Sequence, residues 1–219
     1  MATYLTHAQA RRVYDRIGRW QDTQPIAERR AVDELVALGA FGQAESVFEL
    51  GCGTGRLAQR LLATQLPGRC RYLGVDVSPA MVRLARERVA PWPDRARVDL
   101  TDGSLRFDAP DGRYDRFLST YVLDLLSPQD IGALIDEAHR LVRPGGLLCL
   151  TSLTHGATRP ARLVTALWQR LWSLRPSLVG GCRPLEIAAH LSPDDWTLRQ
   201  QRTLTSVAIT SQVVIAERR

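Results

Sequence analysis

One segment of this chain constrains its fold more than any other, because a short apolar run leads through a glycine-rich turn into a helical pattern. The run covers residues 46–50, the turn contains Gly51, Gly53 and Gly55, and apolar residues recur at helical spacing over residues 57–66. A strand, a glycine turn and a helix in this order let the backbone approach a ligand closely at the end of the strand. The segment therefore predicts a ligand site in a fold of alternating strands and helices.

The alternation of strands and helices continues from residue 70 to residue 152. Strand and helix patterns follow one another over residues 70–77, 78–89, 97–101, 114–120, 128–142 and 147–152. Alternating strands and helices form βαβ units, which predict an α/β fold with a mostly parallel sheet. The last two strand patterns, 196–204 and 207–216, are separated by a short turn, so the sheet is expected to end in an antiparallel hairpin.

The chain of 219 residues is expected to form a single domain, residues 1–219, with two additions to this core. Residues 1–44 predict N-terminal helices, the second of which begins near Pro25 and runs to Leu38. Residues 153–193 form an insertion after the fifth strand that is too long for a plain connector.

The insertion carries an apolar stripe that is denser than a surface helix requires. Its members are Leu163, Leu167, Trp168, Leu171, Trp172 and Leu174. We expect the insertion to cap the carboxyl ends of the strands, with Gly180–Gly181 as a hinge and Arg183 as an anion-binding group. A helix packed on the core is the alternative interpretation.

Composition narrows the class of protein further. With 45% hydrophobic and 24% charged residues, the chain matches ordinary globular usage. No apolar run approaches the ~18 residues of a membrane span, and the N-terminus lacks the apolar stretch of a signal peptide, so a cytoplasmic protein without a membrane span is expected. The net charge of +6 comes from arginine alone, and the chain lacks both Lys and Asn. This bias favours a GC-rich gene over nucleic-acid binding as its cause.

The cysteines suggest neither a metal site nor a disulfide framework. Cys52, Cys70, Cys149 and Cys182 show no CxxC spacing. Reduced, mostly buried thiols and no metal ion are therefore expected.

Carboxylates follow three of the predicted strands and indicate the kind of ligand. Glu49 precedes the glycine turn, where it suits a cationic ligand and would repel a pyrophosphate. Asp76 ends the second strand, where such folds present an acid to ribose hydroxyls. Asp102, followed by Gly103 and Ser104, can pair with an adenine edge. These positions predict a ligand with a ribose, an adenine and a positive charge but no phosphate.

Five motifs, in order, carry a resemblance to a known family. They are VFELGCGTGRLA, GVDVSPAM, TDGS, YDRFLSTYVLDLL and LVRPGGLLCL, and they cover residues 47–150. The sequence resembles the class I S-adenosylmethionine-dependent methyltransferases, closest in style to the small bacterial quinone-biosynthesis-like members (methyltransferase type 11/25). The resemblance implies a Rossmann-like, seven-stranded sheet with helices on both faces. It also implies S-adenosyl-L-methionine as cofactor and S-adenosyl-L-homocysteine as product.

The resemblance assigns one group of residues to the methionine part of the cofactor. Gly51, Gly53 and Gly55 would pass under it, and Glu49 would contact it directly or through water. The carbonyl of Ser119 would accept from the amino group. Tyr121 would lie beside the methyl group, and Tyr14 and Trp20 of an N-terminal helix would lie against the sulfonium or simply dock that helix.

A second group is assigned to the adenosine part. Asp76 would take both ribose hydroxyls, and Val77 and Met81 would flank the adenine. Asp102 would accept from the adenine amino group, and Gly103 or Ser104 would offer a backbone N–H.

Methyl transfer from a sulfonium is an in-line displacement, so alignment supplies most of the catalysis. His155, just past the fifth strand, is the first candidate for a general base, and Asp124 is a second. A small, apolar or aromatic acceptor is expected, with the protein acting as a monomer or homodimer. The alternatives are a methyltransferase of RNA or protein and a non-catalytic S-adenosylmethionine-binding regulatory protein.

Overall fold

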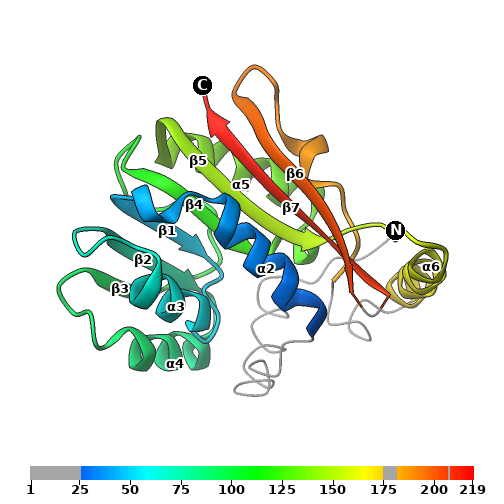
Figure 1. Ribbon diagram of the computed structural model, residues 1–219, viewed down its shortest axis with the longest axis horizontal. Helices are drawn as coiled ribbons and strands as arrows, with labels where there is room; N and C mark the ends of the chain where they lie inside the picture. Colours follow the sequence, from blue (N-terminus) through cyan, green and yellow to red (C-terminus); the bar gives the residue numbers. More distant parts are fainter. Residues whose placement is uncertain (1–25, 175–181, 207) are drawn as a thin grey trace.

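The computed structural model describes residues 26–174, 182–206 and 208–219, and its centre is a seven-stranded sheet in the order β3-β2-β1-β4-β5-β7-β6 (Figure 1). The strands are β1 (Ser46–Leu50), β2 (Arg71–Asp76), β3 (Ala96–Leu100), β4 (Tyr114–Thr120), β5 (Val142–Leu153), β6 (Trp196–Ser206) and β7 (Ile209–Arg218). The first five pair in parallel, whereas β7 is antiparallel to both β5 and β6. The mostly parallel sheet and the C-terminal hairpin are therefore confirmed.

Helices cover both faces of the sheet (Figure 1). The α-helices are α2 (Ile26–Leu38), α3 (Arg56–Thr64), α4 (Pro79–Val89), α5 (Pro128–Leu141) and α6 (Arg159–Leu174). Short 3-10 helices are η2 (Phe41–Gln43), η3 (Leu123–Leu125) and η5 (Ile187–His190). Apolar residues of α2, α3 and α4 share one core layer, and those of α5 share the other.

Strand β1 shows why its sequence is a continuous apolar run. Val47 faces the core layer under α2–α4, whereas Phe48 and Leu50 face the layer under α5. A central parallel strand is buried on both faces, so it needs apolar side chains at nearly every position. The exception is Glu49, a carboxylate that is only 1% exposed.

Most elements begin and end within two residues of the sequence prediction, and the largest difference is five residues at the start of β5. Strand β5 starts at Val142 rather than 147, because Val142 already pairs with Tyr114 before the register shifts and pairing resumes at Leu147. Strand β6 extends to Ser206, and it contains a further register shift between Leu198 and Gln200.

Helix starts follow the sequence closely. Ser78 caps α4 by accepting a hydrogen bond from the Met81 N–H at 3.3 Å, with Pro79 at the first helical position. The predicted second N-terminal helix is α2, while the first N-terminal helix lies outside the described residues.

All four cysteines are free, and Cys182 alone is not fully buried, which confirms the expected thiols.

Helix α6 follows the carboxyl end of β5 and lies at one end of the sheet, not over either face (Figure 1). Of the helices in the described part of the chain, none is both long and apolar enough to cross a membrane. Strands β1, β2, β4 and β5 run in parallel, so their carboxyl ends lie at the same edge of the sheet, which carries Glu49, Asp76 and Ser119.

Candidate functional site

The carboxylate of Asp76 ties together the ends of β1 and β2. Its Oδ2 accepts a hydrogen bond from the Gly53 N–H at 2.9 Å, and its Oδ1 accepts one from the Ser78 N–H at 2.9 Å. The N–H groups of Gly51 and Cys52 donate to the Val75 carbonyl at 2.8 and 3.1 Å. The glycine turn is therefore fixed against the neighbouring strand end.

The three positions in this turn are occupied by glycine for different physical reasons. All have positive φ, namely 71° at Gly51, 53° at Gly53 and 79° at Gly55. A Cβ at Gly51 would lie 2.3 Å from Val122, and one at Gly55 would lie 2.8 Å from the Ala85 backbone, so both must stay bare. A Cβ at Gly53 would meet nothing within 4 Å. The backbone of Gly53 therefore borders open space that a ligand can occupy.

Glu49 lies beneath this turn with a partner that the sequence analysis did not identify. The Tyr72 hydroxyl donates to Glu49 Oε2 at 2.5 Å. A Cβ at Gly74 would lie 2.7 Å from that hydroxyl, so the bare glycine in β2 makes room for the pair. Burial raises the pKa of Glu49 to about 7, while the Tyr72 hydrogen bond lowers it and the Asp76 charge raises it. A bound cation would favour the ionised form.

The residues that the sequence analysis assigned to the adenine amino edge are hydrogen-bonded to their own neighbours. Asp102 is exposed, and its Oδ1 accepts from the Ser104 N–H at 2.8 Å. The Gly103 N–H donates to Thr101 Oγ1 at 3.3 Å. Both backbone donors that the sequence suggested for a ligand are thus engaged locally. Val77 is half-buried and Met81 is 1% exposed.

The end of β4 supplies two further predicted residues. Ser119 is buried, and its hydroxyl donates to the Leu50 carbonyl at 3.1 Å, which ties β4 to β1. Tyr121 has φ of 55°, a conformation that costs energy for a bulky residue and is typical of functional sites. Its hydroxyl lies 3.0 Å from Ser211 Oγ, and burial raises the pKa of Tyr121 well above its usual value. The phenol therefore stays protonated.

Asp124 is a buried carboxylate just past β4, in η3. It is 1% exposed, and neither oxygen makes a well-formed hydrogen bond to any residue in the described part of the chain. Burial raises the pKa of Asp124 to about 6, although the nearby positive charge of Arg183 lowers it. The Ser152 hydroxyl is likewise buried and without a hydrogen-bond partner among the described residues.

Glu28 of α2 adds a second carboxyl group near Asp124. Burial, together with the Asp124 charge, raises the pKa of Glu28 to about 7. No sequence pattern pointed to Glu28, because the packing of α2 brings it near residues almost a hundred positions away. Paired carboxyl groups with raised pKa values are typical of functional sites.

His155 stands apart from this cluster. It is exposed, and no hydrogen bond or ion pair joins it to another residue that the structure describes. The predicted aromatic residues Tyr14 and Trp20 lie outside the described residues. Across the described ranges, no group of three or more His, Cys, Asp and Glu side chains is arranged to hold a metal ion.

The chain returning from α6 crosses the ends of β4 and β5. The Arg183 N–H donates to the Asp124 carbonyl at 3.0 Å, and the Leu185 N–H donates to the Leu153 carbonyl at 3.0 Å. Arg183 Nη2 also donates to the Leu126 carbonyl at 3.1 Å, so this guanidinium holds a loop and is not a free anion-binding fork. The predicted hinge Gly180–Gly181 lies outside the described residues.

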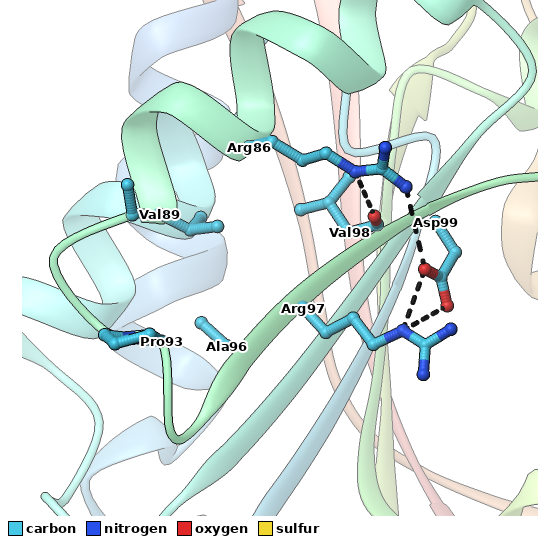
Figure 2. Close-up of a pocket in the computed structure, with 8 residues that line it drawn as sticks. Arg86, Val89, Pro93, Ala96, Arg97, Val98 and Asp99 are labelled. Carbon is cyan, nitrogen blue, oxygen red and sulfur yellow. Dashed lines mark hydrogen bonds and ion pairs between the residues drawn. The ribbon is translucent and has the colours of Figure 1, made fainter.

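A groove of about 410 Å³ lies elsewhere, between the end of α4 and the edge strand β3 (Figure 2). Arg86 Nε donates to the Val98 carbonyl at 2.8 Å, and Arg97 pairs with Asp99 (Figure 2). The groove runs along β3 from Ala96 to Asp99, and the glycine turn is not part of its lining. The Arg86 side chain thus covers one carbonyl of this edge strand, which hinders pairing with another chain.

Comparisons with known proteins agree with this geometry. Residues 47–146 match the sequence family described as a methyltransferase domain. The chain is 32% identical over 107 residues to a carboxy-S-adenosyl-L-methionine synthase of Chromohalobacter salexigens, covering 48% of this chain and 38% of that protein. It is 27% identical over 170 residues to a demethylmenaquinone methyltransferase of Tropheryma whipplei, covering 74% and 64%. The chain spans less than two thirds of either relative.

The fold also matches a solved structure along almost its whole length. The N-methyltransferase NodS from Bradyrhizobium japonicum, in complex with S-adenosyl-L-homocysteine, aligns with a TM-score of 0.72 and 19% identity over 97% of both chains. At that identity the likeness concerns the fold. The family match shows a methyltransferase domain over residues 47–146, and the motifs in that range resemble those of the class I S-adenosylmethionine-dependent methyltransferases.

The buried carboxyl group of Asp124 predicts a pH-dependent stability. Its pKa rises from 3.8 to about 6 on folding, so its contribution to stability is complete below pH 3.8 and is lost as the pH rises through 6. Between pH 5 and pH 8 the loss is about 1.4 kcal/mol. In urea titrations, Asp124→Asn is expected to remove this part of the pH dependence. Asp136→Asn, at an exposed carboxylate, should retain it, and equal behaviour of both variants would contradict the assignment.

Proposed function

We propose that this protein transfers a methyl group from S-adenosylmethionine to a small, apolar or aromatic molecule at the carboxyl edge of the sheet. The observation that carries the proposal is the open backbone at Gly53, held by Asp76 and lying over the buried carboxylate of Glu49. This set fits a cofactor that has ribose hydroxyls and a positive charge but no phosphate.

The residues present can hold each part of the cofactor. Asp76 accepts the N–H groups of Gly53 and Ser78, and we propose that the same carboxylate also takes the ribose hydroxyls. The Gly51–Gly55 turn and Glu49 would hold the methionine part, with the Ser119 carbonyl facing its amino group.

The adenine ring would be held by two segments, one after β2 and one after β3. Val77 and Met81 would flank the ring, with Asp102 at its amino edge. Because the N–H groups of Gly103 and Ser104 are engaged locally, either would have to exchange its partner to bind the ring.

The cofactor supplies an activated methyl group, and the chain supplies alignment and a place for the acceptor's proton. Alignment alone can be worth ~7–11 kcal/mol. Tyr121, with its strained backbone and protonated hydroxyl, would line the acceptor side as a neutral hydrogen-bonding group.

Asp124 is the candidate base that the geometry favours for an acceptor that must lose a proton. A pKa of about 6 leaves the carboxylate ionised at neutral pH yet basic enough to accept a proton. Its oxygens are not engaged by well-formed hydrogen bonds in the described chain. His155 is the alternative proposal, supported by its place just past β5.

The proposal that the insertion after β5 caps the site is supported by its second half, the segment that follows α6. The segment after α6 crosses the ends of β4 and β5 and contacts Asp124. We propose that this segment, residues 182–187, closes the acceptor side. Free thiols fit a reducing compartment such as the cytoplasm, and a monomer or homodimer would suffice for the site.

The cofactor role of Asp76 can be tested by calorimetry with S-adenosyl-L-homocysteine. Asp76→Asn is expected to weaken binding by about 1.5–3 kcal/mol, because a charged hydrogen-bond acceptor is lost. Asp136→Asn should bind like the unaltered protein. An unchanged affinity for Asp76→Asn would remove this residue from the site.

The two candidate bases can be separated by turnover. Release of S-adenosyl-L-homocysteine is measured against a panel of small phenols and amines. Asp124→Asn is expected to lower turnover ~10²–10⁴-fold with cofactor affinity unchanged, whereas His155→Ala retains it. The reverse result would assign the base to His155, and normal turnover in both variants would show that alignment alone suffices.

A further inference from the structure

Helix α6 exposes a row of apolar side chains. Leu163 is 75% exposed, Leu167 60%, Leu171 37% and Val164 38%. Three of them are spaced four residues apart, so they lie on one face of the helix. We call these four residues the leucine stripe. A cap or a helix packed on the core would bury the apolar face of this insertion, but Leu163, Leu167 and Leu171 are exposed.

The stripe is not the side by which α6 attaches to the protein. Ala161 is fully buried, and the Trp168 indole N–H donates to the Cys182 carbonyl at 2.9 Å. These residues lie on a different side of the helix from Leu163 and Leu167. The helix is therefore already docked while its leucine stripe faces outward.

The charge of α6 is of one sign. Arg159, Arg162 and Arg170 are all exposed, and the helix has no Asp or Glu. Within the described ranges, none of the three forms an ion pair. The sequence on both sides of α6 also lacks negative charge, because no acidic residue occurs between Glu137 and Glu186.

A helix with outward leucines and only basic charges has the composition of helices that lie in a lipid interface. At 1.5 Å per residue, its 16 residues span roughly 24 Å, less than the ~30 Å hydrocarbon core, so it would lie along the surface. Packing two copies through this helix would bring like charges together. Nucleic acid would pair with the arginines but would leave the leucines in water.

We propose that α6 binds the surface of an anionic lipid membrane, with the leucine stripe inserted below the headgroups and Arg159, Arg162 and Arg170 paired with lipid phosphates. Helix α6 lies at one end of the sheet (Figure 1), so the rest of the domain can remain in water. The proposal does not depend on which acceptor is methylated.

The test is cosedimentation of the full chain with phosphatidylcholine vesicles, with and without phosphatidylglycerol. The protein is expected to bind the vesicles that contain phosphatidylglycerol and to lose affinity as salt is raised. Failure to bind anionic vesicles at low salt would overturn the proposal.

Leucine variants test the inserted face. Leu163→Asp/Leu167→Asp is expected to lower vesicle affinity at least ~tenfold, because apolar insertion is lost. The matched control is Leu100→Asp/Leu198→Asp, at leucines that are 50% and 47% exposed on β3 and β6. Equal losses in both pairs would overturn the proposal. Binding of S-adenosyl-L-homocysteine is used to show that each variant is folded. If the Leu163→Asp/Leu167→Asp variant is not folded, Leu163→Gln/Leu167→Gln is measured in its place.

Arginine variants test the charge. Replacing Arg159, Arg162 and Arg170 by Gln is expected to weaken binding roughly a hundredfold, at a factor of about five for each charge. The matched control replaces Arg69, Arg83 and Arg97, whose side chains are exposed elsewhere in the described chain. One further outcome would overturn the proposal: the unaltered protein is a dimer, and the leucine variant dissociates it but still binds vesicles. The leucine stripe would then contact a second copy of the chain.

Discussion

The carboxylate of Asp76 is the interaction on which the rest of the site depends. It accepts backbone N–H groups from Gly53 and Ser78, so one side chain fixes both the glycine turn after β1 and the start of α4. Hydrogen bonds to an ionised acceptor are about twice as strong as neutral ones. In the proposed function the same carboxylate also takes the ribose hydroxyls, so one group serves both structure and binding.

The site concentrates buried carboxyl groups that a stable core would avoid. Glu49 and Asp124 are each 1% exposed, and burial raises the pKa of both toward neutrality. Burying such groups costs stability, so their presence at one edge of the sheet points to function. The two differ in their surroundings, since Glu49 is held by Tyr72 while Asp124 makes no well-formed hydrogen bond in the described chain.

Periodicity and turn chemistry predicted the fold because they act locally. Central strands covered on both faces read as continuous apolar runs, and Ser78 with Pro79 marks a helix start. The glycines after β1 likewise indicated a turn that approaches a ligand. These features need no knowledge of distant residues.

What the sequence did not predict depends on packing between distant segments. The Tyr72–Glu49 hydrogen bond joins two strands, and the closeness of Glu28 to Asp124 follows from how α2 docks. The stripe of α6 shows a related limit, because amphipathic spacing identifies an apolar face but not whether that face is turned inward. Leu163 and Leu167 face solvent, while Ala161 and Trp168 attach the helix.

A crystal structure with S-adenosyl-L-homocysteine tests the central claim most directly. We predict the ribose hydroxyls within hydrogen-bond distance of Asp76 and the homocysteine part over Gly51–Gly53, with the sulfur facing Tyr121. Density for the ligand in the groove between α4 and β3, or anywhere away from the Asp76 carboxylate, would contradict it.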